Sequence, residues 1–292
     1  MTPETRSKRH DLMRAIAHLL EPHDCVQGVV AVGSVATNTA RSDSDIDAIV
    51  FMSPLDRYIV PAEALWRPKD DSFHSIFATD VGEDAIPLDL MLRDFDLWRD
   101  SEAPWTDAQK AGLVEAWIAF DRHGDVATMI EEKTTYTETV RTSKLDAAVT
   151  GLDQLLAEGV PERTWEHLGA VRSLDRLVAA GSLLFDLLFA VNWAWRPWPE
   201  RQMTFLLALP RLPRNFEARL LDAMSGGADH DGFLFRASVL RGLFAAILSD
   251  LQAEGFYGTN PVGEAFVRSH EEPGRAWNMD AWNRRRRPPW GS

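Results

Sequence analysis

The sequence predicts an α+β (α/β) amino-terminal domain with a mixed sheet of four to five strands, followed by an all-α helical bundle. Two observations predict this division. Up to about residue 130, apolar runs rich in β-branched residues alternate with helical segments, as in a sheet packed between helices. Beyond it, apolar residues recur at helical spacing and β-branched runs are few. We therefore expect domains at 1–130 and 131–270, with a Trp-, Arg- and Pro-rich tail at 271–292.

Within the first domain, the expected elements follow from the period of the apolar residues. Apolar residues that alternate or run together over about four to eight positions indicate strands, and apolar residues three to four apart indicate helices. The strands expected are 26–32, 45–52, 72–81 and 86–92, and the helices expected are 5–20, 54–66 and 107–120.

The second domain is expected to be a bundle of about five helices. Its apolar residues recur at the spacing of a helix face, and Gly or Pro residues separate the periodic segments. The helices expected are 138–157, 163–194, 200–208, 214–225 and 231–255.

Composition and charge narrow the classes of function. The chain has 292 residues, 45% hydrophobic and 26% charged, as in a globular protein. A net charge of −13 disfavours a nucleic-acid partner, which requires Lys and Arg contacts to phosphates, and is compatible with a cationic small substrate. Cys25 is the only cysteine, so the chain cannot form an internal disulfide and a reducing compartment is expected. Residues 1–10 are too polar for a signal peptide. The most apolar segment, 177–191, is interrupted by Asp186, which argues against a membrane-spanning helix. We therefore expect a cytoplasmic protein without a membrane partner.

One motif near the amino terminus carries the chemistry. An apolar run meets Gly33-Ser34, and ten residues later Asp45-Ile46-Asp47 leads into the next apolar run. Residues two apart in a strand point to the same face, so Asp45 and Asp47 would present two carboxylates side by side. Such an oxygen-only, doubly negative site suits Mg²⁺, while Gly33 and Ser34 offer close backbone approach and a hydroxyl to a phosphate.

At these residues the chain resembles the nucleotidyltransferase superfamily, which includes polymerase β and the antibiotic adenylyltransferases. The family signature is Gly-Ser, about ten residues, and then Asp-x-Asp in an apolar strand, which matches Gly33-Ser34 and Asp45-Ile46-Asp47. Asn38 stands where a Gly is common, and Asn also enters left-handed conformations. The basic residues common after Gly-Ser are missing, and Arg41 is the nearest substitute.

The resemblance implies a nucleoside triphosphate, ATP, as donor. It implies that Gly33, Ser34, Arg41 and Ser44 contact this nucleotide and that Asp45 and Asp47 hold two Mg²⁺ ions. Without the resemblance, the acids have another interpretation: Ser42-Asp43-Ser44-Asp45 is also turn and N-capping chemistry.

Asp89 is a lone acid inside the apolar strand 86–92. A buried carboxylate is costly unless it is paired or bound to a metal. In the resembled family, a third acid on a later strand completes the metal site and takes the proton of the acceptor hydroxyl. Asp89 matches this acid because it also lies within an apolar strand that follows the Asp-x-Asp strand. The alternative is an edge-strand Asp that faces water.

Two residues of the helical bundle are candidates for contacts with the acceptor substrate. Asp186 lies between apolar triplets in the longest helix, where it would anchor an acceptor amine or hydroxyl, or else form an internal ion pair with an arginine. Trp193 belongs to an aromatic cluster whose rings would stack on sugars, bases or cations, or else anchor a helix end in the core.

The function expected is Mg²⁺-dependent transfer of a nucleoside monophosphate, AMP from ATP, to a hydroxyl of a small molecule such as an aminoglycoside-type antibiotic. One alternative is a nucleotidyltransferase that modifies RNA or protein, as toxin and antitoxin enzymes of the superfamily do. Another is a non-catalytic nucleotide-binding module. Four consecutive arginines in the tail, Arg284–Arg287, could meet RNA or phosphates, although such a tail more often covers its own acidic domain.

Overall fold

A computed structural model of the chain describes residues 1–79, 81–82 and 85–269, with the backbone alone at residues 18–19. The chain divides into two compact units, Met1–Thr135 and Tyr136–Ser292. Asp80, Glu83, Asp84 and the arginine-rich tail lie outside the described residues.

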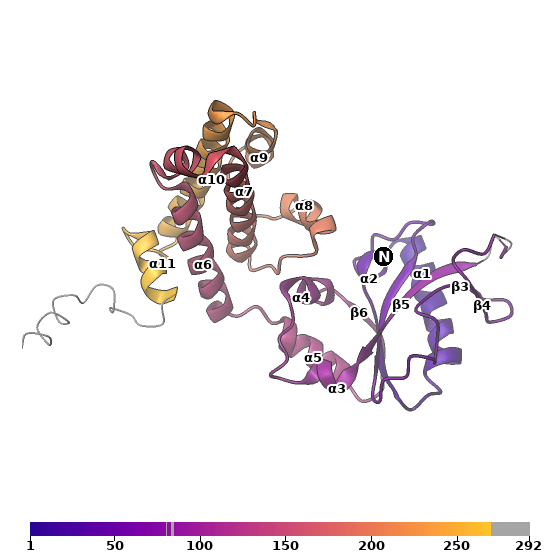
Figure 1. The fold of residues 1–292 in the computed structure, drawn as a ribbon. Coiled ribbons are helices and arrows are strands. Elements are labelled where there is room, and N and C mark those ends of the chain that lie inside the picture. The colour runs from indigo at the N-terminus through magenta and orange to yellow at the C-terminus, as the bar shows by residue number, and fades with distance from the viewer. Residues whose placement is uncertain (80, 83–84, 270–292) are drawn as a thin grey trace, which may run out of the picture. The chain divides into compact units, whose positions relative to one another are not determined.

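The amino-terminal unit is built on a six-stranded mixed sheet in the order β4-β3-β5-β2-β1-β6 (Figure 1). Strands β2 and β5 run parallel and the other neighbours antiparallel. The elements are α1 Pro3–Ala15, the π-helical turn η1 Ile16–Leu20, β1 Val26–Ala31, α2 Gly33–Ala36, β2 Ile46–Met52, β3 Glu63–Arg67, β4 Ser72–His74, β5 Ile86–Asp94, α3 Phe95–Arg99, α4 Asp107–Leu113, β6 Trp117–Asp121 and α5 Asp125–Thr134. The predicted mixed sheet with helices is confirmed, with six strands instead of four to five.

The two faces of this sheet are covered by different helices, because side chains alternate along each strand. On one face, Ala48 and Leu90 pack in a core with Leu12 of α1. On the other, Ile49 and Phe51 pack in a core with residues of α3, α4 and α5. The sheet is therefore the middle of three layers.

Three predictions in this unit were wrong. The segment 54–66 is not a helix, since β3 begins at Glu63 and pairs with β5. Residues 63–67 lie between Pro61 and Pro68, and along them buried and less buried side chains alternate, which is the period of a strand. The helix expected over 107–120 ends at Leu113, and β6 follows as an edge strand beside β1. The strand expected over 72–81 is limited to β4.

The second unit is helical, as predicted. Its elements are α6 Glu138–Leu156, α7 Val160–Val191, α8 Pro199–Leu207, α9 Phe216–Ser225, α10 His230–Ala253 and α11 Pro261–Ser269. Among the described residues, α10 is the one helix long and apolar enough to cross a membrane. Its inward side chains, such as Leu240, Leu243 and Ile247, are buried in the core of this unit.

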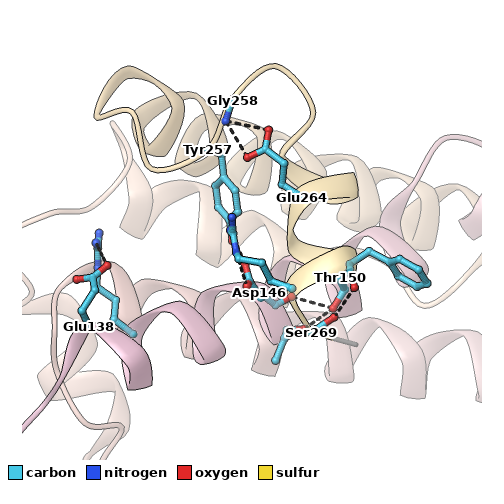
Figure 2. Close-up of polar contacts among 11 residues, drawn as sticks. Glu138, Asp146, Thr150, Tyr257, Gly258, Glu264 and Ser269 are labelled. Atoms are coloured by element: carbon cyan, nitrogen blue, oxygen red, sulfur yellow. Dashed lines mark hydrogen bonds and ion pairs between the residues drawn. The ribbon is translucent and has the colours of Figure 1, made fainter. Parts of the chain in front are cut away.

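Helix α11 was not predicted, and a buried carboxylate attaches it to α6 (Figure 2). The Asp146 side chain of α6 is 3% exposed, and both of its oxygens accept hydrogen bonds from the Arg268 guanidinium, at 2.9 and 2.8 Å. The Tyr257 hydroxyl donates to the same carboxylate at 2.8 Å. Burial and the Asp146 charge raise the pKa of the Tyr257 phenol far above its ordinary value, so it stays a donor.

Asp146→Ala is expected to lower the free energy of unfolding of the helical unit by about 3 kcal/mol, because it leaves a guanidinium and a hydroxyl without their buried partner. The value is at the low end for buried pairs because Arg268 is partly exposed. Urea titration with hydrogen exchange on peptides of α6 and α11 measures the change. Glu138→Ala removes a carboxylate of the same helix that is 58% exposed and lies 3.6 Å from Arg141, and because Arg141 keeps Glu254 at 3.8 Å, the change should cost less than about 1 kcal/mol. Equal costs for the two variants would contradict the role of Asp146.

Candidate functional site

The Gly33-Ser34 pair forms a tight turn at the end of β1. Gly33 has a φ of 61° and Asn38 a φ of 64°, both in the left-handed region. Gly enters that region without steric cost and Asn enters it more readily than other residues, which accounts for Asn38 where the resembled family often has Gly. Arg9 of α1 stabilises the turn, since its guanidinium donates to the carbonyl oxygens of Val35 and Ala36 at 3.0–3.1 Å.

This turn lies directly beside the Asp-x-Asp pair. The Val32 amide, one residue before Gly33, donates to the Asp47 carbonyl oxygen at 3.0 Å. Ile46 is buried, whereas Asp47 is half-buried and Asp45 is exposed just before β2 begins. The predicted juxtaposition of the Gly-Ser turn with the Asp-x-Asp acids is therefore present in the backbone.

Asp89 lies next to Asp47 on the neighbouring strand. The two residues are partners in the parallel register of β2 and β5, and on the other side of β5 Glu63 of β3 is the partner of Asp89. Residues directly opposite each other on neighbouring strands point to the same face. Three acids, Asp47, Asp89 and Glu63, therefore form a row across three strands.

The row lies at one end of the sheet face that is otherwise packed against α3, α4 and α5. Along β2, Asp47 is followed on this face by Ile49 and Phe51, and along β5, Asp89 is followed by Met91. Those apolar side chains enter the core, whereas Asp47 and Asp89 are half-buried. The acids therefore lie on this face just outside the apolar core that α3, α4 and α5 cover, where a ligand can reach them.

The electrostatic environment of Asp89 is dominated by burial and by like charges. Burial raises the pKa of the Asp89 carboxyl, the negative charges of Glu63 and Asp45 raise it further, and Arg93 of the same strand opposes them. Negative charges gathered around a carboxyl in this way favour the binding of a cation.

In the metal-free protein, Asp89 is expected to titrate above the ordinary Asp value of about 3.9. Because its neighbours act through their charges, Asp45→Asn should lower this pKa and Arg93→Gln should raise it further. Carbon-13 NMR titration of the labelled Asp carboxyls measures both changes. Shifts in the same direction for the two variants would contradict this account of the site.

A divalent metal ion is compatible with the chemistry of these donors. The acids supply oxygen atoms alone, which Mg²⁺ prefers, and they carry negative charge from three strands. Within the part of the chain that the structure describes, no three His, Cys, Asp or Glu side chains stand close enough together to ligate one ion. The register of the strands nevertheless places the acids in one row. A change of side-chain rotamer, which takes picoseconds to nanoseconds where side chains are exposed, would bring their oxygen atoms together around an ion.

The other nucleotide-contact candidates lie in the turn before β2. The Arg41 side chain is 78% exposed and pairs with Asp43 at 3.1 Å, and the Arg41 amide donates to the Ser44 hydroxyl at 3.0 Å. Arg93, which the sequence interpretation missed, carries a positive charge on the same strand face as Asp89. Glu63 was missed because its segment was interpreted as a helix; the alternation along 63–67 was the available signal.

Both candidates of the helical unit lie near the carboxyl end of α7. The Asp186 carboxylate accepts a hydrogen bond from Arg196 at 2.8 Å, so the structure contains the internal ion pair that was one of its two interpretations. Trp193 has a φ of 55°, rare for a bulky residue, and is 44% exposed. Its ring lies against the Arg141 guanidinium at 4.8 Å and near the Tyr136 ring at 6.2 Å.

Part of the amino-terminal unit matches a known protein family. Residues 12–93 match the family model of the nucleotidyltransferase domain. The matched segment contains the Gly-Ser turn and Asp45, Asp47, Glu63 and Asp89, and it supports nucleotidyl transfer as the general reaction.

The whole chain is similar to the crystal structure of a nucleotidyltransferase-like protein from Exiguobacterium sibiricum 255-15, with 12% sequence identity and a TM-score of 0.41. The similarity covers 90% of this chain and 81% of that chain. No curated protein matches the sequence.

Proposed function

We propose that this chain is a Mg²⁺-dependent nucleotidyltransferase that moves a nucleoside monophosphate, AMP from ATP, to a hydroxyl of a small molecule. One observation carries the proposal: Asp47 and Asp89 are register partners on parallel strands, directly beside the Gly33-Ser34 turn, within the segment that matches the nucleotidyltransferase domain.

The acids have distinct roles in this reaction. Asp45 and Asp47 would hold two Mg²⁺ ions, with Asp89 as a further ligand. When bound, these ions supply neutralising charge to the triphosphate and the leaving pyrophosphate. Asp89 accepts the proton of the acceptor hydroxyl, whose oxygen bonds to the α-phosphorus as the bond from that phosphorus to the bridging oxygen of pyrophosphate breaks.

The turn residues hold the donor nucleotide. Gly33 lets the backbone approach the phosphates closely, and the Ser34 hydroxyl donates a hydrogen bond to them. Arg41 and Ser44 are proposed as further contacts, which requires the exposed Arg41 side chain to exchange Asp43 for a phosphate. Such an exchange costs little because exposed ion pairs contribute at most about 1 kcal/mol.

The helical unit is proposed to bind the acceptor. Trp193 supplies an exposed indole, and Asp186, although paired with Arg196, keeps 39% of its side chain exposed. An aminoglycoside-type antibiotic is the proposed acceptor class, because it offers hydroxyls for transfer and amines for carboxylates. The net charge of −13 is compatible with such a cationic molecule.

The experiment that tests the function is transfer from α-labelled nucleoside triphosphates. ATP, GTP, CTP and UTP are each incubated with the protein, Mg²⁺ and a panel of aminoglycosides, lincosamides, RNA and cell extract. Mass spectrometry then identifies the species that gains a nucleotide. Adenylylation of a small molecule is the expected result, whereas labelled RNA or protein, or no Mg²⁺-dependent product from any acceptor, would overturn it.

The matched control is the Asp45→Ala, Asp47→Ala double variant, which removes the proposed metal ligands from an otherwise identical chain. Label transfer that persists in this variant would come from another site or from a contaminating enzyme.

A further inference from the structure

Glu63 is an acid of the row that neither the Asp-x-Asp motif nor the nucleotidyltransferase match assigns to the site. We propose that Glu63 is a positioning acid, which helps to hold the divalent cation by accepting hydrogen bonds from water molecules that the ion carries. This inference rests on the proposed function, because it assigns a fourth acid to the same cation site.

The geometry of the sheet places Glu63 in this position. It pairs with Asp89 in the antiparallel register of β3 and β5, and Asp89 pairs with Asp47 in the parallel register of β5 and β2. Neighbouring strands lie about 4.8 Å apart, so Glu63 is one strand from Asp89 and two strands from Asp47. Because Asp89 stands between Glu63 and Asp47 in the row, Glu63 would act on a cation held by Asp47 and Asp89 through water rather than directly.

The alternation of side chains shows that Glu63 shares a face with the other acids. Its neighbour Ala64 is buried, as are Leu88 and Leu90 on either side of Asp89, whereas Glu63 itself is exposed. The Glu63 charge also acts on its register partner Asp89, where it raises the pKa of that carboxyl. The exposed side chain has one methylene more than Asp, and this length extends its reach toward the ion.

The hydration of Mg²⁺ explains why a water-mediated contact would be useful. This ion binds few protein ligands and keeps several of its waters, and acids that bond to such waters orient them. Loss of a group that acts on a metal by hydrogen-bonding one of its direct ligands typically costs about 10- to 100-fold in metal affinity. Glu63 would thus contribute to cation binding while Asp45, Asp47 and Asp89 remain the direct ligands.

The test measures binding of Mn²⁺ alone by electron paramagnetic resonance, so that no catalytic step is involved. Glu63→Gln keeps the size of the side chain and removes its charge, and should weaken Mn²⁺ binding about 10-fold. Glu63→Asp restores the charge on a shorter side chain and should recover part of the affinity. The matched control is Glu115→Gln, which removes one charge from an exposed acid outside the row and should change the affinity less than 2-fold, about the long-range effect of a single surface charge.

Asp47→Asn and Asp89→Asn separate this inference from the proposed function. If both abolish Mn²⁺ binding but Glu63→Gln binds like Glu115→Gln, Glu63 has no part in a cation site that is otherwise correct. If neither Asp variant changes Mn²⁺ binding, the cation site itself is wrong and the proposed function fails with it. Urea unfolding of Glu63→Gln should match the wild type, since an exposed side chain contributes little to stability; a large loss would show a structural role instead and overturn the inference.

Discussion

Asp47→Ala is expected to abolish Mg²⁺-dependent release of pyrophosphate, with a loss of about 10³-fold or more in rate. Asp47 occupies the middle of the site, with Asp89 beside it on β5 and the Gly33 turn beside its carbonyl group. A metal ion that neutralises charge on the reacting phosphates lowers the barrier by several kcal/mol, and about 4 kcal/mol corresponds to about 10³-fold in rate. Asp45→Ala should have an effect of the same order. A coupled pyrophosphate assay at saturating ATP and Mg²⁺ measures both.

The control for these variants is Asp43→Ala. Asp43 belongs to the same turn but is 71% exposed and pairs only with Arg41 among the ion pairs of the described residues, so its loss should leave the rate within about 3-fold. Circular dichroism should show that all three variants keep the fold. Full activity in either Asp45→Ala or Asp47→Ala would remove the metal assignment from this pair of acids.

Asp89→Asn is expected to separate binding from turnover. The amide keeps the size and hydrogen-bonding capacity of the side chain but cannot accept the proton of the acceptor hydroxyl. General-base catalysis contributes about 10²- to 10⁴-fold, so kcat should fall by that factor while ATP still binds through the Gly33-Ser34 turn and the Asp-x-Asp acids. Isothermal titration calorimetry with ATP and Mg²⁺, beside steady-state kinetics, measures the two effects separately.

Asp94→Asn is the matched control on the same strand. Its carboxylate accepts a hydrogen bond from the Leu97 amide as the N-cap of α3, a role that Asn fills about equally well. It should therefore keep the turnover number of the wild type. An unchanged turnover number in Asp89→Asn would assign the base to another residue.

The central part of the site could be predicted from the sequence because its signals are local. The Gly-Ser pair, the spacing to Asp45 and Asp47, and the apolar runs on both sides lie within one short segment. Asp89 could be singled out as a candidate because an acid inside an apolar strand is costly without a partner, and its place beside Asp47 came from the register. The long helices of the second unit were predictable for a similar reason, since their periods extend over many turns.

What could not be predicted depends on contacts between distant segments. Strand β3 is five residues long, too short for its alternation alone to distinguish a strand, and its pairing with β5 fixes it as one. Glu63 thus joined the row of acids only once this register was known. The same holds for Asp146, which in sequence is one polar residue of a helix and in the structure is the buried partner of Arg268 and Tyr257.

The bond between Asp146 and Arg268 also has a consequence for how the helical unit is made on the ribosome. Its two residues are 122 positions apart, so α6 leaves the exit tunnel long before its partner has been translated. Until Arg268 has been made, the Asp146 carboxylate has no guanidinium to neutralise it, so it must stay hydrated or take up a proton. The packing of α11 on α6 is therefore completed only when nearly the last of the described residues has been translated.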